Sequence, residues 1–278
     1  MALGAVINRG WRLFGTGLSF TVFGVGGLVL ALLVFPVISI TSRDEVTRAR
    51  RARAVVSRSF RSFLWMMHGL GVFDFDVDPR CREACRSDSG LIVAANHPTL
   101  IDVVQLLAEI PHGNCIVKEA LWHNFFLGLV VRATNYISND DSEQLVSECV
   151  EALGRGETLV IFPEATRTVP GQPMRLRRGA ARVALAANVP MQMIHISCKP
   201  STLTKAEHWF EIPERRPCLR TRVGDRLDIG AFATDGEEPS MAARRLTELM
   251  LSKFETNENN SERHRTSDQR ADHRSAQS

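Results

Sequence analysis

The sequence has a single tyrosine, a formal net charge of only +3 over 278 residues, and no cysteine pair spaced as in zinc or redox motifs. The weak positive charge and the lack of an aromatic-rich ribonucleoprotein motif argue against nucleic-acid binding. Three of the six cysteines, Cys115, Cys149 and Cys198, lie inside apolar patterns, as reduced core cysteines do. We therefore expect a reducing, cytosol-facing compartment rather than a disulfide framework.

One long hydrophobic run stands near the N-terminus. Residues 20–40 carry no charge and are rich in Leu, Val and Phe. At 1.5 Å per residue, an apolar helix of this length reaches about 30 Å, the thickness of a bilayer core. A cleavable signal peptide has a shorter apolar region that ends at small residues. We therefore expect residues 1–42 to form an uncleaved membrane helix, and its glycines and proline leave open whether it spans the bilayer or is kinked into an interfacial or re-entrant shape.

Positive charge gathers directly after this run. Residues 41–63 contain seven arginines against Asp44 and Glu45. By the positive-inside rule, this cluster predicts an inner-membrane protein whose following domain faces the cytoplasm. Residues 43–70 are expected to form a basic amphipathic helix that suits anionic headgroups, with an ordinary solvated helix as the alternative.

Beyond residue 90, short apolar runs alternate with longer amphipathic segments. Such alternation is typical of an α/β fold, which we expect over residues 71–254 as one domain with a mostly parallel sheet flanked by helices. Ligands of such sheets bind beyond the carboxyl ends of the strands. Residues 255–278 are expected to be a disordered tail. The pattern predicts strands at 91–95, 115–118, 136–138, 158–162, 191–197 and 219–223, and helices at 100–109, 119–132, 142–153, 177–187 and 239–254.

The first polar cluster follows the predicted strand at 91–95. Residues 96–102 read Asn-His-Pro-Thr-Leu-Ile-Asp. If a helix begins near Pro98, Asp102 can hold one imidazole nitrogen of His97 and leave the other free to take a proton as a general base. By itself, a histidine at a strand end is more often a structural hydrogen bonder, and two ligands are too few for a metal site.

The second polar cluster follows the predicted strand at 158–162. Residues 162–168 read Phe-Pro-Glu-Ala-Thr-Arg-Thr, with further arginines at 175, 177 and 178. A turn that holds Glu164 and Arg167 suits an anionic group, because arginine binds phosphate in a bidentate manner. A surface ion pair would use the same two residues.

Together the two clusters resemble the first and third motif blocks of the glycerolipid acyltransferase family, which includes the 1-acylglycerol-3-phosphate acyltransferases. The family reads N-H-x-S-x-x-D and F-P-E-G-T-R-S in these blocks. Residues 189–194 resemble its fourth block, and residues 118–121 and 178–188 resemble further family segments. The resemblance covers about residues 88–200 in order.

The resemblance implies a membrane-bound O-acyltransferase of lipid biosynthesis, with acyl-CoA or acyl-carrier protein as donor and no cofactor or metal. In that scheme His97 is the general base and Asp102 orients it, as the aspartate does in a hydrolase triad. Glu164, Arg167 and Thr99 then hold the acceptor lipid. No covalent acyl-enzyme is needed, and the sequence has no Gly-x-Ser-x-Gly nucleophile motif.

Two departures from the family pattern bear on the acceptor. Ala165 stands where the family has glycine. Because alanine has a Cβ atom, we expect the backbone to have a negative φ at this position. The second block of the family ends in Asp-Arg, whereas residues 136–141 contain no arginine. The acceptor is 1-acylglycerol-3-phosphate or, as the alternative, another lysolipid or a specialised acyl product. A non-catalytic lipid-binding relative and a hydrolase that uses water are the alternatives from other classes.

Overall fold

Residues 3–87, 89–124, 127–139, 142–169, 171–232 and 238–256 are described by a computed structural model, so the expected tail lies beyond residue 256 outside these ranges. Within them, seven strands form one sheet in the order β1-β7-β6-β2-β5-β3-β4. The strands are β1 (Asp74–Val77), β2 (Leu91–Ala95), β3 (Asn114–Val117), β4 (Ile137–Ser138), β5 (Thr158–Ile161), β6 (Met191–Lys199) and β7 (Cys218–Leu227).

The sheet is mostly parallel, as the sequence pattern predicts. Strands β6, β2, β5, β3 and β4 run in one direction. Strand β7 is antiparallel to β6, and β1 pairs in parallel with β7 at the edge. Strand β1 was not predicted, because its sequence Asp-Phe-Asp-Val is half polar and its pairing partner lies far along the chain.

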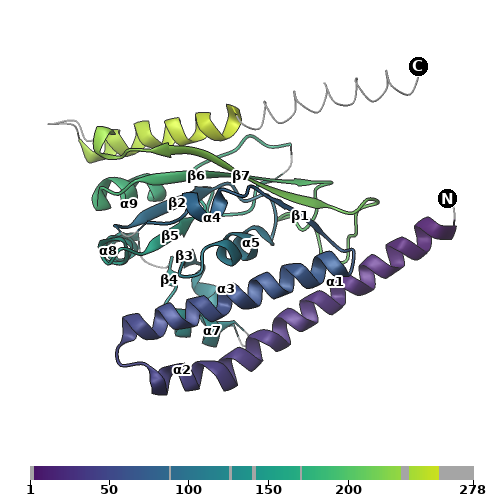
Figure 1. The fold of residues 1–278 in the computed structure, drawn as a ribbon. Helices are drawn as coiled ribbons and strands as arrows, with labels where there is room; N and C mark the ends of the chain where they lie inside the picture. The colour runs from purple at the N-terminus through teal and green to yellow at the C-terminus, as the bar shows by residue number, and fades with distance from the viewer. Residues whose placement is uncertain are drawn as a thin grey trace.

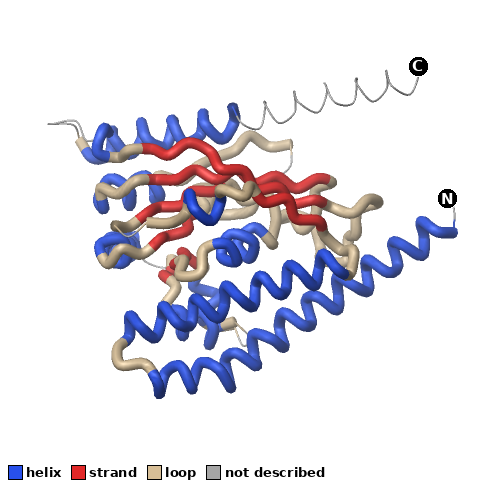
Figure 2. The backbone as a smooth tube through the Cα atoms, in the orientation of Figure 1, coloured by secondary structure: helices blue, strands red, loops and turns tan. Residues whose placement is uncertain are grey.

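Helices cover both faces of the sheet (Figures 1 and 2). One face packs on α3 and α5, and the other on α8, α9 and the C-terminal helix over 239–256. The helices are α1 (Leu3–Val29), the π-helix η1 (Leu30–Val34), α2 (Phe35–Thr41), α3 (Glu45–Gly69), α4 (Cys81–Ala84), α5 (Asp102–Glu109), α6 (Glu119–Trp122), α7 (Gly128–Thr134), α8 (Ser142–Gly154), α9 (Gly179–Ala187) and the 3-10 helix η2 (Gly230–Phe232).

Strand β2 lies at the centre of the sheet. Its five residues are all fully buried. Leu91, Val93 and Ala95 contribute to the core under α3 and α5, whereas Ile92 and Ala94 contribute to the core under α8 and α9. A strand that is buried on both faces reads as a continuous apolar run, which is why the sequence predicts its bounds correctly.

The segment predicted as one helix over 119–132 forms two short helices, α6 and α7. Gly128 begins α7, and a Cβ atom at this position would lie 2.5 Å from the carbonyl oxygen of Trp122. The side chain of Asn124 accepts a hydrogen bond from the backbone N–H of Leu127. This close approach of backbone to backbone separates the two helices, and the hydrophobic period alone does not reveal it.

The N-terminal helix is longer than the predicted apolar run. α1, η1 and α2 follow one another from Leu3 to Thr41, and a π turn closes where the N–H of Phe35 bonds to Leu30 O. Pro36 lacks an N–H, and in an α-helix its ring would collide with the carbonyl four residues earlier, so the wider turn admits it. The segment Val6–Thr41 is long and apolar enough to cross a membrane.

Helix α3, predicted as a basic amphipathic helix over residues 43–70, runs beside α1 and buries its apolar side. Val56, Phe63 and Met67 are buried, and Phe23 of α1 packs on Phe63 with ring centroids 5.1 Å apart. The arginines of α3 divide into two groups, because Arg53 is buried whereas others remain exposed. The apolar side of α3 therefore contacts the protein core and is not available to a bilayer.

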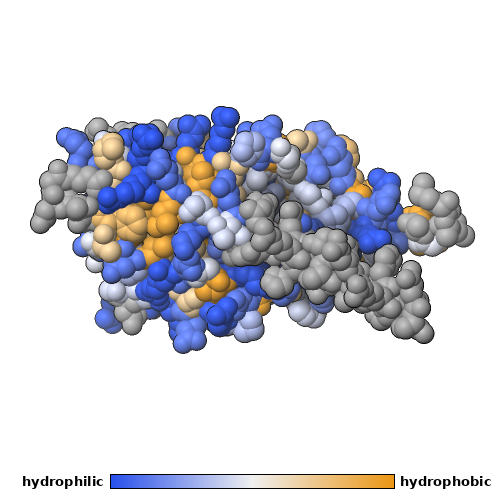
Figure 3. Space-filling view, turned by 90° about the horizontal axis from the view of Figure 1, so that it is seen from above, coloured by the Kyte–Doolittle hydropathy of each residue, from blue (hydrophilic) through white to orange (hydrophobic). Residues whose placement is uncertain are grey.

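The two outer faces of the molecule differ in character. Large apolar side chains of the N-terminal helix are exposed, including Val25, Leu32, Leu33 and Ile40. The view from the side of the C-terminal helix shows a face that is mostly hydrophilic, with smaller hydrophobic patches (Figure 3).

Candidate active site

The two polar clusters meet at the carboxyl edge of the parallel strands. Ala94 of β2 pairs with Ile161 of β5, and His97 and Glu164 each lie three residues beyond these partners. Because parallel strands end at the same edge, the register brings the two clusters together. The backbone N–H of His97 donates a hydrogen bond to Glu164 Oε1 at 2.8 Å.

Asn96 fixes the first turn to the neighbouring strand. Its side-chain Nδ2 donates to Ile196 O and its Oδ1 accepts from Ile196 N, both at 2.7 Å. The amide side chain thus continues the pairing of β2 with β6 after the backbone has left the sheet. This role of Asn96 was not predicted, although its place directly after a buried strand is the signal that points to it.

His97 and Asp102 form the predicted pair. His97 Nδ1 lies 3.0 Å from Asp102 Oδ2. The histidine side chain is 16% exposed and the aspartate fully buried. Phe162 packs on the imidazole with ring centroids 4.4 Å apart. Among the described residues, Nε2 of His97 has no hydrogen-bond partner, so it is the nitrogen that remains to accept a proton.

Asp102 is held by the turn as well as by the histidine. The backbone N–H of Thr99 donates to Asp102 Oδ2 at 2.8 Å, and the Thr99 hydroxyl accepts from Ile101 N. Burial raises the pKa of Asp102 to about 6, while the hydrogen bond and charge of His97 act in the opposite direction. Thr99 is fully buried in the turn and its backbone hydrogen bond orients Asp102, while its predicted contact with the acceptor stays a prediction.

Glu164 ties the third motif block to the first. Both of its carboxylate oxygens lie 2.9 Å from the Thr168 hydroxyl, in addition to the bond from the His97 backbone. The backbone N–H of Thr168 donates in return to His97 O at 2.7 Å. The carboxylate therefore connects the two loops through hydrogen bonds.

Ala165 adopts a left-handed backbone conformation with φ of 57°. The expectation of a negative φ is wrong. The turn keeps the geometry for which glycine is best suited, and the alanine side chain tolerates it at a cost of about 1–2 kcal/mol.

Arg167 has a structural contact that the sequence does not reveal. Its Nη1 donates to the carbonyl oxygens of Leu203 and Thr204, at 2.8 and 2.9 Å, on the loop between β6 and β7. Its predicted contact with the acceptor stays a prediction, and the guanidinium also borders a cavity of about 420 Å³. The cavity is shared with Glu164, Arg175 and Lys205, of which Lys205 was not predicted.

The remaining predictions concern the second motif block, the cysteines and a possible metal site. β4 and the residues up to Asn139 belong to the second block, whereas Asp140 and Asp141 lie outside the described residues. All six cysteines are free thiols. Within the described parts of the chain, no group of three or more His, Cys, Asp or Glu side chains is arranged to hold a metal ion.

Comparison with known proteins gives the same family as the motifs. Residues 77–197 match the family described as Acyltransferase. A 1-acyl-sn-glycerol-3-phosphate acyltransferase from Cocos nucifera is 27% identical over 38% of this chain. The alpha form from Mus musculus is 26% identical over 68% of this chain. The alignments span 36% of the coconut protein and 65% of the mouse protein.

The fold is also shared with a solved structure. The crystal structure of the 1-acyl-sn-glycerophosphate (LPA) acyltransferase from Thermotoga maritima superposes with a TM-score of 0.63 and covers 90% of this chain and 98% of that one, at 20% identity. At this low identity the superposition shows that the two chains share a fold. The matched residues 77–197 contain both polar clusters and make up somewhat less than half of the chain, so this part of the chain is similar to the acyltransferase family.

Proposed function

We propose that this chain transfers an acyl group from a thioester donor to the hydroxyl of a lysophospholipid, with 1-acylglycerol-3-phosphate as the acceptor. The observation that carries the proposal is the His97–Asp102 pair at 3.0 Å, with Nε2 of the ring left to face a reactant. The relatives named for this reaction support the same choice of acceptor.

The reaction needs one base and a good leaving group. His97 Nε2 removes the proton from the acceptor hydroxyl as its oxygen attacks the thioester carbonyl, and a tetrahedral intermediate forms. When this collapses, the C–S bond breaks and the imidazolium returns the proton to the departing thiolate. The products are an ester and a free thiol. Asp102 holds Nδ1 and stabilises the imidazolium that forms.

Glu164, Arg167 and Thr99 have distinct parts in this scheme. Glu164 fixes the backbone of His97 relative to the third block. Arg167 borders the cavity beside that block and meets the anionic end of the acceptor. Thr99 fixes Asp102. The donor is acyl-CoA or acyl-carrier protein, and both supply the same thioester.

The test is an acyl-transfer assay with the full chain in lipid vesicles, labelled acyl-CoA or acyl-carrier protein, and a panel of lysolipids, with the products identified by mass spectrometry. A new diacyl lipid is the expected product. Free fatty acid as the only product would assign a hydrolase instead. A lack of turnover with every acceptor would leave a lipid-binding relative.

We further propose that the N-terminal helix attaches the enzyme to the cytoplasmic leaflet by lying in the bilayer surface. The apolar segment Val6–Thr41 supports membrane association. α3 packs alongside this helix, and Arg51 of α3 donates a hydrogen bond to Thr41 O at 3.0 Å. A steep crossing would draw the exposed Arg50 and Arg58 of α3 into hydrocarbon, which costs several kcal/mol for each charge.

Thiol labelling distinguishes the two topologies. The variant Gly4→Cys places a reactive group at the exposed start of α1, on the far side of the apolar segment from the catalytic domain in the sequence. In sealed vesicles, an impermeant maleimide should label it from the same side as the catalytic domain, with the parent chain as background. Labelling from the opposite side alone would establish a spanning helix.

A further inference from the structure

The cavity beside the third motif block is lined by cations from two distant segments. Arg167 and Arg175 come from the loop after β5, and Lys205 comes from the loop between β6 and β7. Glu164 is the single carboxylate on its lining. Its oxygens accept hydrogen bonds from the His97 backbone and the Thr168 hydroxyl. The cavity therefore has an excess of positive charge.

Two of these cations are available to a ligand. Within the described residues, the side chains of Arg175 and Lys205 have no hydrogen bond or ion pair, and both are exposed. Exposed cations that converge on one cavity and are not paired with a protein carboxylate suit a phosphate group, whose oxygens accept several charge-assisted hydrogen bonds.

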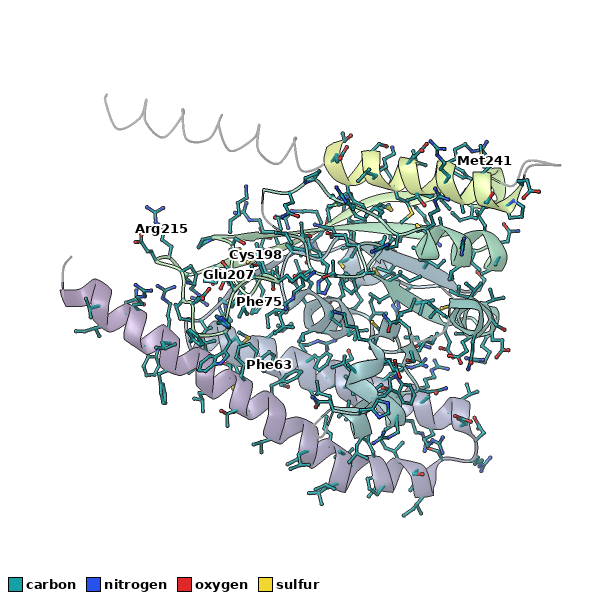
Figure 4. The ribbon with its side chains drawn as sticks, turned by 180° about the vertical axis from the view of Figure 1, so that it is seen from behind. Phe63, Phe75, Cys198, Glu207, Arg215 and Met241 are labelled. Carbon is teal, nitrogen blue, oxygen red and sulfur yellow. The ribbon has the colours of Figure 1, made fainter. Side chains whose placement is uncertain are left out.

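Arg167 sets the position of Lys205. Its Nη1 bonds to the carbonyl oxygens of Leu203 and Thr204, the two residues directly before the lysine. The same Leu203 carbonyl also accepts from the N–H of Leu100, and Thr204 N donates to Glu207. The backbone is thus fixed up to the residue before Lys205, and Arg167 is a positioning residue for this lysine. Figure 4 shows Glu207 on this loop, beside Cys198 of β6.

The cavity adjoins the proposed base. Glu164 and Thr168 on its lining bond to the backbone N–H and carbonyl of His97. In a glycerol 3-phosphate group, the 2-hydroxyl is separated from the phosphate ester oxygen by only two carbons. A phosphate held in the cavity therefore keeps that hydroxyl close to His97.

We propose that Arg175 and Lys205, together with Arg167, bind the phosphomonoester of the acceptor and replace the arginine that the second block of this chain lacks. The inference rests on the proposed acyl transfer and names the residues that select the acceptor.

The ligand chemistry fits a lipid as well as free glycerol 3-phosphate, and one contact favours the lipid. Trp209, four residues after Lys205, is 49% exposed. Its ring lies edge-on to Phe20 of α1, with centroids 6.4 Å apart. The loop that carries the lysine thus continues onto the apolar N-terminal helix, where the acyl chain of a lysolipid would lie in the bilayer.

The experiment compares three acceptors in vesicles that contain the full chain: 1-acylglycerol-3-phosphate, the uncharged 1-acylglycerol, and soluble glycerol 3-phosphate. Lys205→Gln and Arg175→Gln should each lower kcat/KM for the phosphorylated lipid by about 10- to 100-fold, the effect of one charge-assisted bond, mainly through KM. Activity with 1-acylglycerol should stay unchanged. Lys205→Arg should restore most of the loss, and Lys253→Gln on the C-terminal helix is the matched control.

A parallel binding measurement separates this inference from the proposed function. The dissociation constant for 1-acylglycerol-3-phosphate is measured with His97→Ala and with His97→Ala/Lys205→Gln. Weaker binding in the double variant supports the phosphate site even if transfer fails. Equal binding, or an equal loss with charged and uncharged acceptors, overturns the site while acyl transfer stands. Preferred transfer to glycerol 3-phosphate would overturn the assignment to a lipid.

Discussion

The two ends of strand β5 each carry a glutamate, partly buried at the amino end and buried at the carboxyl end, and the two side chains have different partners. Before the strand, Glu157 meets Arg53 at 2.6 Å and Asn114 at 2.9 Å. Burial would raise the pKa of Glu157, but the charge and hydrogen bonds of its partners outweigh this effect and lower it. After the strand, Glu164 accepts from a backbone N–H and a threonine hydroxyl.

The cations near the two ends of β5 also differ in their partners. At the amino end, Arg53 also donates to the carbonyl oxygens of Thr134 and Asn135, so the cation is used entirely by the protein. At the carboxyl end, Arg175 and Lys205 remain exposed on a cavity. A cation whose partners all belong to the protein has a structural role, whereas a cation left exposed beyond the carboxyl ends of the strands is available to a ligand.

The largest expected effect tests the carboxyl end. His97→Ala should lower the rate of acyl transfer by about 10²–10⁴-fold, because the acceptor hydroxyl loses its general base. The melting temperature and vesicle binding should stay close to those of the wild type, since the ring is at the rim of the core. A variant with wild-type activity would contradict the assigned role.

The next effect tests the amino end. Arg53→Met should lower the free energy of unfolding by about 1–3 kcal/mol, because Glu157 loses its buried cation and keeps only the more exposed Arg155. The specific activity of the remaining folded protein should be unchanged. Denaturant titration measures this, with the exposed Arg58→Met on the same helix as control. If Arg53→Met and Arg58→Met are equally stable, the buried pair is not a structural anchor. The double variant Arg53→Met/Glu157→Leu should recover much of the loss.

A pH titration sharpens the contrast. The pKa of Asp102 is raised to about 6, above that of an unfolded aspartate. Its protonated form therefore favours the folded state, and this contribution to stability is lost as the pH rises through about 6. Activity should change in the opposite direction and fall about tenfold per pH unit below 6, because a protonated Asp102 cannot stabilise the imidazolium.

The variant Asp102→Asn is the control for this titration. It should be slower than the wild type at every pH and should lack the part of the profile that depends on Asp102. An unchanged profile in this variant would assign the titration to another group.

The smallest effect concerns the turn between the two ends of the site. Ala165→Gly should raise the free energy of unfolding by about 0.5–1 kcal/mol, because glycine adopts the positive φ without strain but has a more flexible unfolded state. Ala187→Gly in helix α9 should instead destabilise by a similar amount. Thermal unfolding of both variants measures the pair, and a loss of stability at both positions would show that Ala165 is not strained.

The sequence predicts the central part of this molecule better than its edges. β2, β5 and β6 are covered on both faces, so their apolar runs are continuous and their bounds are nearly right. The edge strand β1 and the break between α6 and α7 depend on contacts with distant backbone, which no local pattern records. The chemistry of the site follows the same division. His97 and Asp102 are five residues apart and were paired correctly.

Long-range contacts account for the features that could not be predicted from the sequence. Arg53 was counted with a basic surface, but its partner Glu157 lies more than a hundred residues away. Lys205 lies on a loop outside the motif blocks. Its place at the cavity follows from the hydrogen bonds between Arg167 and the two residues before the lysine. Ala165 was expected at negative φ because a side chain usually requires it, whereas the register of the two loops imposes the turn.

The π turn at Leu30–Val34 rotates the part of the N-terminal helix before it relative to the part after it. It contains one residue more than an α-helical turn, and each residue of a helix turns the chain by about 100°. Removing one residue there would rotate everything before it relative to α2. Phe23 would then leave its stack on Phe60 and its edge-on contact with Phe63, and the buried polar side chains of α1, such as Thr16 and Ser19, would turn away from the protein. The orientation of the N-terminal helix about its own axis thus depends on a single extra residue.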